Sequence, residues 1–188
     1  MRLSGKHALV TGGGRGIGLA TAKVFAREGA AVAIADLDET RAIEAAAAIE
    51  AAGGRALAVQ ADVGDPVSIN RMVETIVTAF GRIDILSNNA GIGGNTPFLE
   101  TTLEEWQRIL QVNLTGAFLV AQAVARVMAQ NGGGKIINIA SLSGQRGGEG
   151  RAAYGAAKAG LDRHHPGEEI EPCLRGAIGG AALAAALA

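Results

Sequence analysis

The chain has 188 residues, 48% of them hydrophobic and 19% charged, which is typical of one globular domain and excludes a disordered protein. Seventeen basic side chains balance eighteen acidic ones, and no basic cluster stands out, so no nucleic-acid partner is expected. The single cysteine excludes an internal disulfide, the N-terminus lacks a long apolar stretch, and the apolar tail 177–188 is too short to span a bilayer. We therefore expect a cytoplasmic protein without a membrane partner.

Five apolar segments of strand length alternate with segments of helix length. The expected strands are 7–12, 31–36, 56–63, 84–91 and 135–141, and the expected helices are 16–28, 38–52, 66–80, 103–130 and one from about 152. The strands are continuous Val, Ile and Ala runs, which is typical of a parallel sheet covered on both faces. Because crossovers between parallel strands are right-handed, we predict an α/β fold with a Rossmann-type, doubly wound parallel sheet of about five strands.

The loop after the first expected strand reads T-G-G-G-R-G-I-G over residues 11–18. It fails the G-x-G-x-x-G fingerprint in every register but matches T-G-x-x-x-G-x-G. Its glycines permit a tight turn and let backbone N–H groups approach a phosphate at a helix N-terminus. Taken alone, such a loop is also compatible with a flexible turn. The predicted phosphate-binding residues are Gly12, Arg15, Gly16, Ile17 and Gly18.

Asp36 ends the second expected strand, eighteen residues beyond Gly18. A carboxylate there can accept hydrogen bonds from the adenosine ribose hydroxyls and would repel a 2′-phosphate. Arg15 acts in the opposite sense, because its guanidinium could meet that phosphate. We predict NAD rather than NADP as the cofactor. The alternative is that Asp36 only begins the turn before Asp38.

Six motifs follow one another in the order of a known enzyme family. They are the T-G-x-x-x-G-x-G loop, Asp62-Val63, Asn88-Asn89-Ala90-Gly91, Asn113, Ser141 and Tyr154-x-x-x-Lys158. In these motifs the chain resembles the short-chain dehydrogenase/reductase family of the Tyr-x-x-x-Lys type. The resemblance covers residues 1–163 and implies one dinucleotide-binding domain that also carries the catalytic residues. It further implies that the adenosine side of the cofactor is framed by Asp62, Val63, Asn89, Ala90 and Gly91.

Tyr154 and Lys158 lie four residues apart in an expected helix and so share one face. A cation beside a phenol stabilises the phenolate, which makes Tyr154 a usable general acid and base. The resemblance implies that Tyr154 exchanges a proton with the substrate oxygen. It also places Tyr154 and Lys158 among the cofactor-binding residues, with Lys158 holding the nicotinamide ribose. Ser141, thirteen residues before Tyr154, is expected to orient the substrate carbonyl, with Ser143 as its rival. By the same resemblance, Asn113 holds a water of a proton relay.

These residues predict an oxidoreductase that transfers a hydride between NAD(H) and a secondary alcohol or ketone. A 3-oxoacyl thioester and a polyol are candidate small-molecule substrates. We expect no metal, because Cys173 lies too far along the chain from the His164-His165 pair to complete a ligand set.

The tail 164–188 departs from the family pattern. It contains no Val, Phe or Tyr, and Pro166 forbids a continuous helix, so we expect little structure in it. In the family, further strands and a substrate-covering segment would follow, which leads us to expect a C-terminally truncated or frameshifted chain. The alternative function is then a catalytically impaired dinucleotide-binding remnant. Members of the family form homo-oligomers, whereas here we expect non-native association through an exposed last strand.

Overall fold

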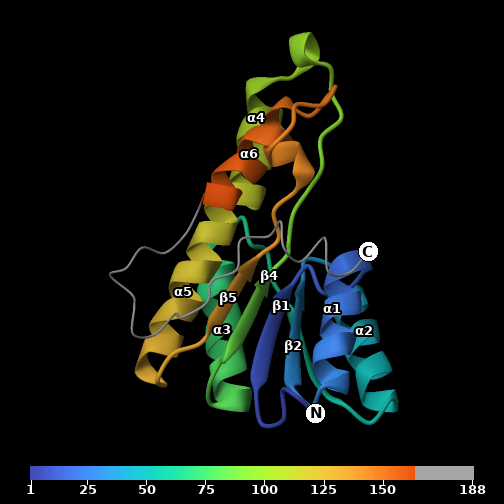
Figure 1. Cartoon of the computed structure of the whole chain (residues 1–188), viewed down its shortest axis with the longest axis vertical. Helices are drawn as coiled ribbons and strands as arrows, with labels where there is room; N and C mark the ends of the chain where they lie inside the picture. The colour runs from blue at the N-terminus through green and yellow to red at the C-terminus, as the bar shows by residue number, and fades with distance from the viewer. Residues whose placement is uncertain (164–188) are drawn as a thin grey trace.

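The structure is a computed structural model that describes residues 1–163. One five-stranded sheet has the order β3-β2-β1-β4-β5, and every neighbouring pair is parallel (Figure 1). The strands are β1 (His7–Thr11), β2 (Ala31–Asp36), β3 (Arg55–Gln60), β4 (Ile85–Asn88) and β5 (Lys135–Asn138). The chain order reverses between β1 and β4, the position at which doubly wound sheets place their ligands. The predicted fold class is confirmed, while our expectation for 164–188 lies outside the described residues.

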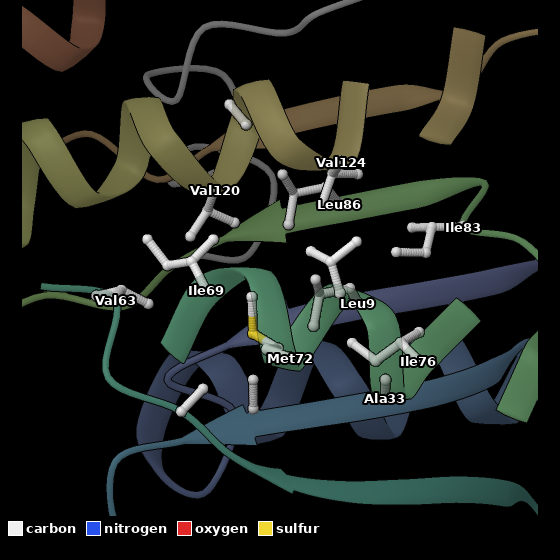
Figure 2. Close-up of a cluster of buried hydrophobic side chains, with 14 of the residues drawn as sticks. Leu9, Ala33, Val63, Ile69, Met72, Ile76, Ile83, Leu86, Val120 and Val124 are labelled. Carbon is white, nitrogen blue, oxygen red and sulfur yellow. The ribbon is translucent and has the colours of Figure 1, made fainter. Parts of the chain in front are cut away.

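Helices cover both faces of the sheet (Figure 1). They are α1 (Gly16–Arg27), α2 (Glu39–Ala51), α3 (Pro66–Phe80) and α5 (Ala117–Gln130). On one face, Val10 and Ile34 are buried against Ala22 of α1 and Ile49 of α2. The other face is drawn in Figure 2, where Leu9 and its neighbours pack against α3 and α5. Because successive strand residues enter opposite cores, the strands are apolar throughout rather than alternating.

The expected helix 103–130 is helical throughout, but in three segments. They are α4 (Leu103–Leu110), a π-helical segment (Gln111–Gly116) and α5. By length and composition this 28-residue run could cross a membrane, since an 18-residue window within it has a mean hydropathy of 1.4. Val120, Val124 and Met128 of α5 are nevertheless fully buried in the core over the sheet. The apolar character of the run is therefore explained by packing within the domain.

Two elements lie beyond the carboxyl ends of the strands, where α6 (Ala152–Arg163) packs on α4 (Figure 1). Their contact is a small apolar cluster of Ile109, Ala153 and Ala157, joined by Trp106 and Tyr154. Two short 3-10 turns adjoin this region, Phe98–Glu100 and Leu142–Gly144. The helix that carries the predicted acid and base is thus held apart from the main cores.

The third strand ends earlier than the sequence suggests, at Gln60 instead of residue 63. Asp62 leaves the strand because its N–H donates to Ser68 Oγ and its carboxylate accepts from Gly64 N. These local bonds compete with the strand ladder. Asp62 and Val63 therefore lie in the loop at the carboxyl edge of the sheet.

Candidate active site

The glycine loop turns from β1 into α1 with very little space around it. Gly12 has a φ of +59°, and a Cβ on Gly12 would lie 3.0 Å from the Cα of Ala90. A Cβ on Gly18 would collide with the carbonyl oxygen of Gly12. The first turn of α1 contains no acidic residue, and Arg15 at its N-cap makes no side-chain capping bond. The positive end of α1 is thus left uncompensated, as an anion site requires.

Thr11 and Asn89 fasten this loop to the end of β4. The Thr11 hydroxyl oxygen accepts from the N–H groups of Asn89 and Ala90, both at 3.0 Å. Asn89 Nδ2 donates to the carbonyl oxygens of Thr11 at 2.9 Å and Gly12 at 3.1 Å. The Asn89 side chain therefore supports the glycine loop. The sequence analysis did not predict this role of Thr11, because only the pairing of β1 with β4 shows which groups its hydroxyl contacts.

Asp36 is held in one orientation at the end of β2. Its Oδ2 accepts from Gly14 N at 2.9 Å and its Oδ1 accepts from Asp38 N at 3.1 Å. Asp38 in turn forms an ion pair with Arg41, with 3.1 Å between Oδ2 and Nε. Two backbone N–H groups thus fix the carboxylate of Asp36, while Arg41 of α2 is paired with Asp38 and not with Asp36.

Most of the predicted cofactor residues line one cavity of about 680 Å³, a volume typical of ligand sites. They are Gly12, Arg15, Gly16, Ile17, Asp36, Asp62, Val63, Asn89, Ala90 and Gly91. Gly18 is buried beneath the loop. Arg41 and Arg108 line the same cavity and were not predicted. A helix N-terminus, a fixed carboxylate and apolar walls match the pyrophosphate, ribose and adenine of a dinucleotide.

Lys158 lies beneath the Tyr154 ring at the inner face of α6. Its Nζ is 5.8 Å from the centroid of the ring and donates to the carbonyl oxygen of Ile139 at 2.7 Å. Only 4% of Lys158 is exposed, and this burial lowers the pKa of its ammonium group to about 8. At neutral pH Lys158 therefore still carries its charge beside the phenol.

Asn113 occupies the π-helical segment and is fully buried. Its Nδ2 donates to the carbonyl oxygens of Ile92 and Ile109, both at 2.9 Å, and its Oδ1 is buried without a partner among the described residues. A Cβ on Gly91 would lie 2.5 Å from that Oδ1 and 3.7 Å from Lys158 Nζ. A buried acceptor without a donor costs free energy of folding. The space beside Gly91, between Asn113 Oδ1 and Lys158 Nζ, therefore suits a water molecule or another hydrogen-bond donor.

Ser141 begins the 3-10 turn that follows β5, and its Oγ accepts from Ser143 N at 3.2 Å. Two glycines let this turn approach α6. A Cβ on Gly144 would lie 2.7 Å from Ala159 N, and a Cβ on Gly155 would lie 2.9 Å from the carbonyl oxygen of Ser143. The sequence shows both glycines, but their partners become visible only in the folded chain.

The model of the family described as "short chain dehydrogenase" matches residues 6–164. The chain belongs to the short-chain dehydrogenase family. The 3-oxoacyl-[acyl-carrier-protein] reductase of Synechocystis sp. is 44% identical over 160 residues, which are 85% of this chain and 65% of the relative. The sorbitol dehydrogenase of Cereibacter sphaeroides is 47% identical over 160 residues, which are 85% of this chain and 61% of the relative.

Solved short-chain dehydrogenase structures agree with this membership. The crystal structure of a short-chain type dehydrogenase/reductase from Mycobacterium marinum has a TM-score of 0.82 and 40% identity, covering 85% of this chain and 64% of that one. The crystal structure titled gox2181 has a TM-score of 0.88 and 36% identity, covering 93% of this chain and 70% of that one. The chain thus spans less than two thirds of the length of the first curated relatives that it matches.

Within residues 1–163 of this short-chain dehydrogenase, no group of three or more His, Cys, Asp and Glu side chains is arranged to hold a metal. The residues weighed as metal ligands in the sequence, His164, His165 and Cys173, lie outside the described residues.

Proposed function

We propose that the chain is an NAD-dependent oxidoreductase that interconverts a secondary alcohol and a ketone. The observation that carries this proposal is the buried Lys158 ammonium beneath the Tyr154 ring, close to Gly91, which lines the cavity around the glycine loop. This arrangement supports the proposal of an acid–base group next to a dinucleotide site.

The residues of the chain divide the work of carbonyl reduction among them. The residues around the glycine loop would hold NADH, which when bound would supply the hydride. Tyr154 donates its phenolic proton to the carbonyl oxygen, so that the alcohol forms and a phenolate remains. Lys158 stabilises that phenolate, and Ser141 donates a hydrogen bond that orients the carbonyl. The Oδ1 of Asn113, which has no partner within residues 1–163 and faces the same side of Gly91 as Lys158, can hold the water that returns a proton toward Tyr154. Oxidation of the alcohol uses the same groups in reverse.

NAD is proposed over NADP because of the carboxylate of Asp36. Two backbone N–H groups fix this carboxylate at the wall of the cavity, where it can accept hydrogen bonds from ribose hydroxyls. A 2′-phosphate would meet its negative charge. Arg15 and Arg41 line the same cavity and favour a phosphate, but Arg41 is paired with Asp38.

The substrate class is proposed from the relatives. Those named above are a 3-oxoacyl-[acyl-carrier-protein] reductase and a sorbitol dehydrogenase, and others are a galactitol 2-dehydrogenase and a D-threitol dehydrogenase. These names share a secondary alcohol or its ketone. We therefore propose a 3-oxoacyl thioester or a polyol as the substrate class of this chain.

The test uses the purified full chain and follows NADH consumption with a panel of ketones and 3-oxoacyl thioesters, and NAD reduction with polyols. We expect turnover that is lost in Tyr154→Phe, while NADH binding is retained. NADH binding without turnover on any substrate would favour the alternative, a dinucleotide-binding remnant. Turnover by Tyr154→Phe at the parent rate would overturn the acid–base assignment.

A further inference from the structure

A second cation faces the ring of Tyr154. The guanidinium carbon of Arg151 lies 5.6 Å from the ring centroid, within the range of a cation–π contact. Lys158 Nζ lies 5.8 Å from the same centroid. Arg151 comes three residues before Tyr154, just ahead of α6, and Lys158 comes four residues after it within α6. The two cations therefore reach the ring from neighbouring helical turns before and after Tyr154.

The two cations respond differently to pH. Lys158 is buried, and its pKa of about 8 means that it loses its charge in the alkaline range in which a phenol ionises. Arg151 is exposed, and a guanidinium stays charged throughout that range. Above about pH 8, Arg151 is thus the member of the pair that keeps a positive charge beside the ring.

We propose that Arg151 is a positioning residue that stabilises the phenolate form of Tyr154. The proposal rests on the proposed role of Tyr154 as acid and base, but the geometry that carries it is the contact between guanidinium and ring. A positive charge over the ring face interacts more strongly with a phenolate than with a neutral phenol. Removal of the charge therefore makes the phenolate harder to form.

The other elements around Tyr154 present mainly apolar groups to it. From α4 and the loop before it, the cluster next to Tyr154 contains Ile92, Trp106, Ile109 and Leu110. The charged residues of α4 are Glu104, Glu105 and Arg108. Glu105 accepts from the Thr96 hydroxyl, and Arg108 lines the dinucleotide cavity.

Charged groups in the loop before α6 provide the matched control. Arg146 and Glu149 line a cavity of about 570 Å³ that Arg151 also lines. Arg146 has the same exposed, cationic side chain as Arg151, and Arg151 is the arginine that lies over the ring. Arg146→Gln therefore removes an equal charge from the same loop without removing the ring contact.

The test exploits the single tyrosine of the chain, which makes any phenolate signal that of Tyr154. The full chain, Arg151→Gln, Arg151→Lys and Arg146→Gln are titrated from neutral to alkaline pH by ultraviolet absorbance and by NMR of a carbon-13 label on the tyrosine ring. Far-ultraviolet circular dichroism at each pH verifies that the chain is folded.

We expect Arg151→Gln to raise the midpoint of the titration by about half a pH unit, which is about a threefold change in the ionisation constant. Arg151→Lys should keep part of the parental behaviour, and Arg146→Gln should leave the midpoint unchanged. Because Arg151 is exposed, molar salt should shrink the difference between the parent and Arg151→Gln.

Equal midpoints for the parent and Arg151→Gln would overturn the proposal, and so would an equal shift in Arg146→Gln. The outcome is independent of turnover. If the chain reduces no ketone but the midpoint still depends on Arg151, the proposed function fails and the inference about the phenol stands.

Discussion

The cofactor side and the catalytic side of this domain are built in different ways. Around the glycine loop, Thr11, Asn89 and Asp36 form a set of hydrogen bonds that connect three strand ends, above two large apolar cores. Around α6, the apolar support is the small cluster of Ile109, Ala153 and Ala157. The groups proposed to carry the chemistry there are a desolvated lysine and a buried amide oxygen that has no partner in the described part of the chain.

This difference leads to different expectations for substitutions on the two sides of the domain. On the cofactor side, the side chains mainly hold backbone N–H groups in place, so a substitution should damage the fold and the binding of NADH together. On the proposed catalytic side, the burial of the Lys158 ammonium group has a cost in stability. A substitution of Lys158 should therefore remove turnover and leave the fold equally or more stable.

Gly18→Ala should have the largest effect. The added Cβ meets the carbonyl oxygen of Gly12, so the loop must open. We expect a loss of about 3 kcal/mol in the free energy of unfolding, together with the loss of NADH binding. Urea denaturation and fluorescence titration with NADH measure the two effects. Gly93→Ala is the control, because its Cβ meets nothing within 4 Å. Equal behaviour of the two variants would mean that the tight loop is not what holds the cofactor side together.

Lys158→Met tests the catalytic side through the pH dependence of stability. The pKa of Lys158 is lowered from 10.5 to about 8 in the folded chain by burial. Below pH 8 the folded state holds an unfavourable buried charge in full. Between pH 8 and 10.5 the folded chain has released a proton that the unfolded chain keeps, so stability rises with pH.

We expect the parent to gain roughly 2 kcal/mol relative to Lys158→Met when the pH is raised from 7.5 to 10. Urea midpoints at the two pH values measure the gain. A constant difference between the two proteins would show that the ammonium group is not desolvated in the folded chain.

Asp36→Ala should change cofactor preference and lower stability by about 1 kcal/mol, because Gly14 N and Asp38 N lose their acceptor. We expect the parent to bind NADH more tightly than NADPH, and the variant to shift this ratio by about tenfold toward NADPH, since the carboxylate no longer repels a phosphate. Glu39→Gln removes a nearby exposed carboxylate and serves as the control. If the parent itself prefers NADPH, then Arg15 or Arg41 dominates the site and the weight given to Asp36 is wrong.

The smallest expected effect is that of Ile137→Lys on the self-association of the chain. Within residues 1–163, β5 is the last strand of the sheet and pairs with β4 on one side. We expect the chain to self-associate through this edge, and Ile137→Lys to reduce the association, because a charge on an edge strand discourages further pairing. Size-exclusion chromatography with light scattering measures it. A monodisperse tetramer that melts cooperatively would contradict the expectation.

The boundaries of an element could be predicted from the sequence where residues at its ends cap it. For α3, the expected range 66–80 is the observed one, because Asp65 caps its start with two hydrogen bonds and Gly81 ends it in the left-handed conformation. The parallel sheet and its doubly wound order also followed from apolar runs that alternate with helices.

Other features depend on contacts between distant residues, which no local pattern contains. The π-helical segment around Asn113 lies within a continuous helical pattern, and nothing in the letters 111–116 marks the change in backbone hydrogen bonding. The hydroxyl of Thr11 gains its function from Asn89 and Ala90, more than seventy residues away.

We propose that the cavity above the glycine loop binds NADH and that the phenol hydroxyl of Tyr154 acts on the substrate, so that its removal spares cofactor binding. Isothermal titration of NADH into the parent and into Tyr154→Phe tests it most directly. We expect one NADH to bind per chain, with the same affinity in both proteins. A folded, cooperatively melting parent that binds no NADH, or a large loss of affinity in Tyr154→Phe, would contradict it.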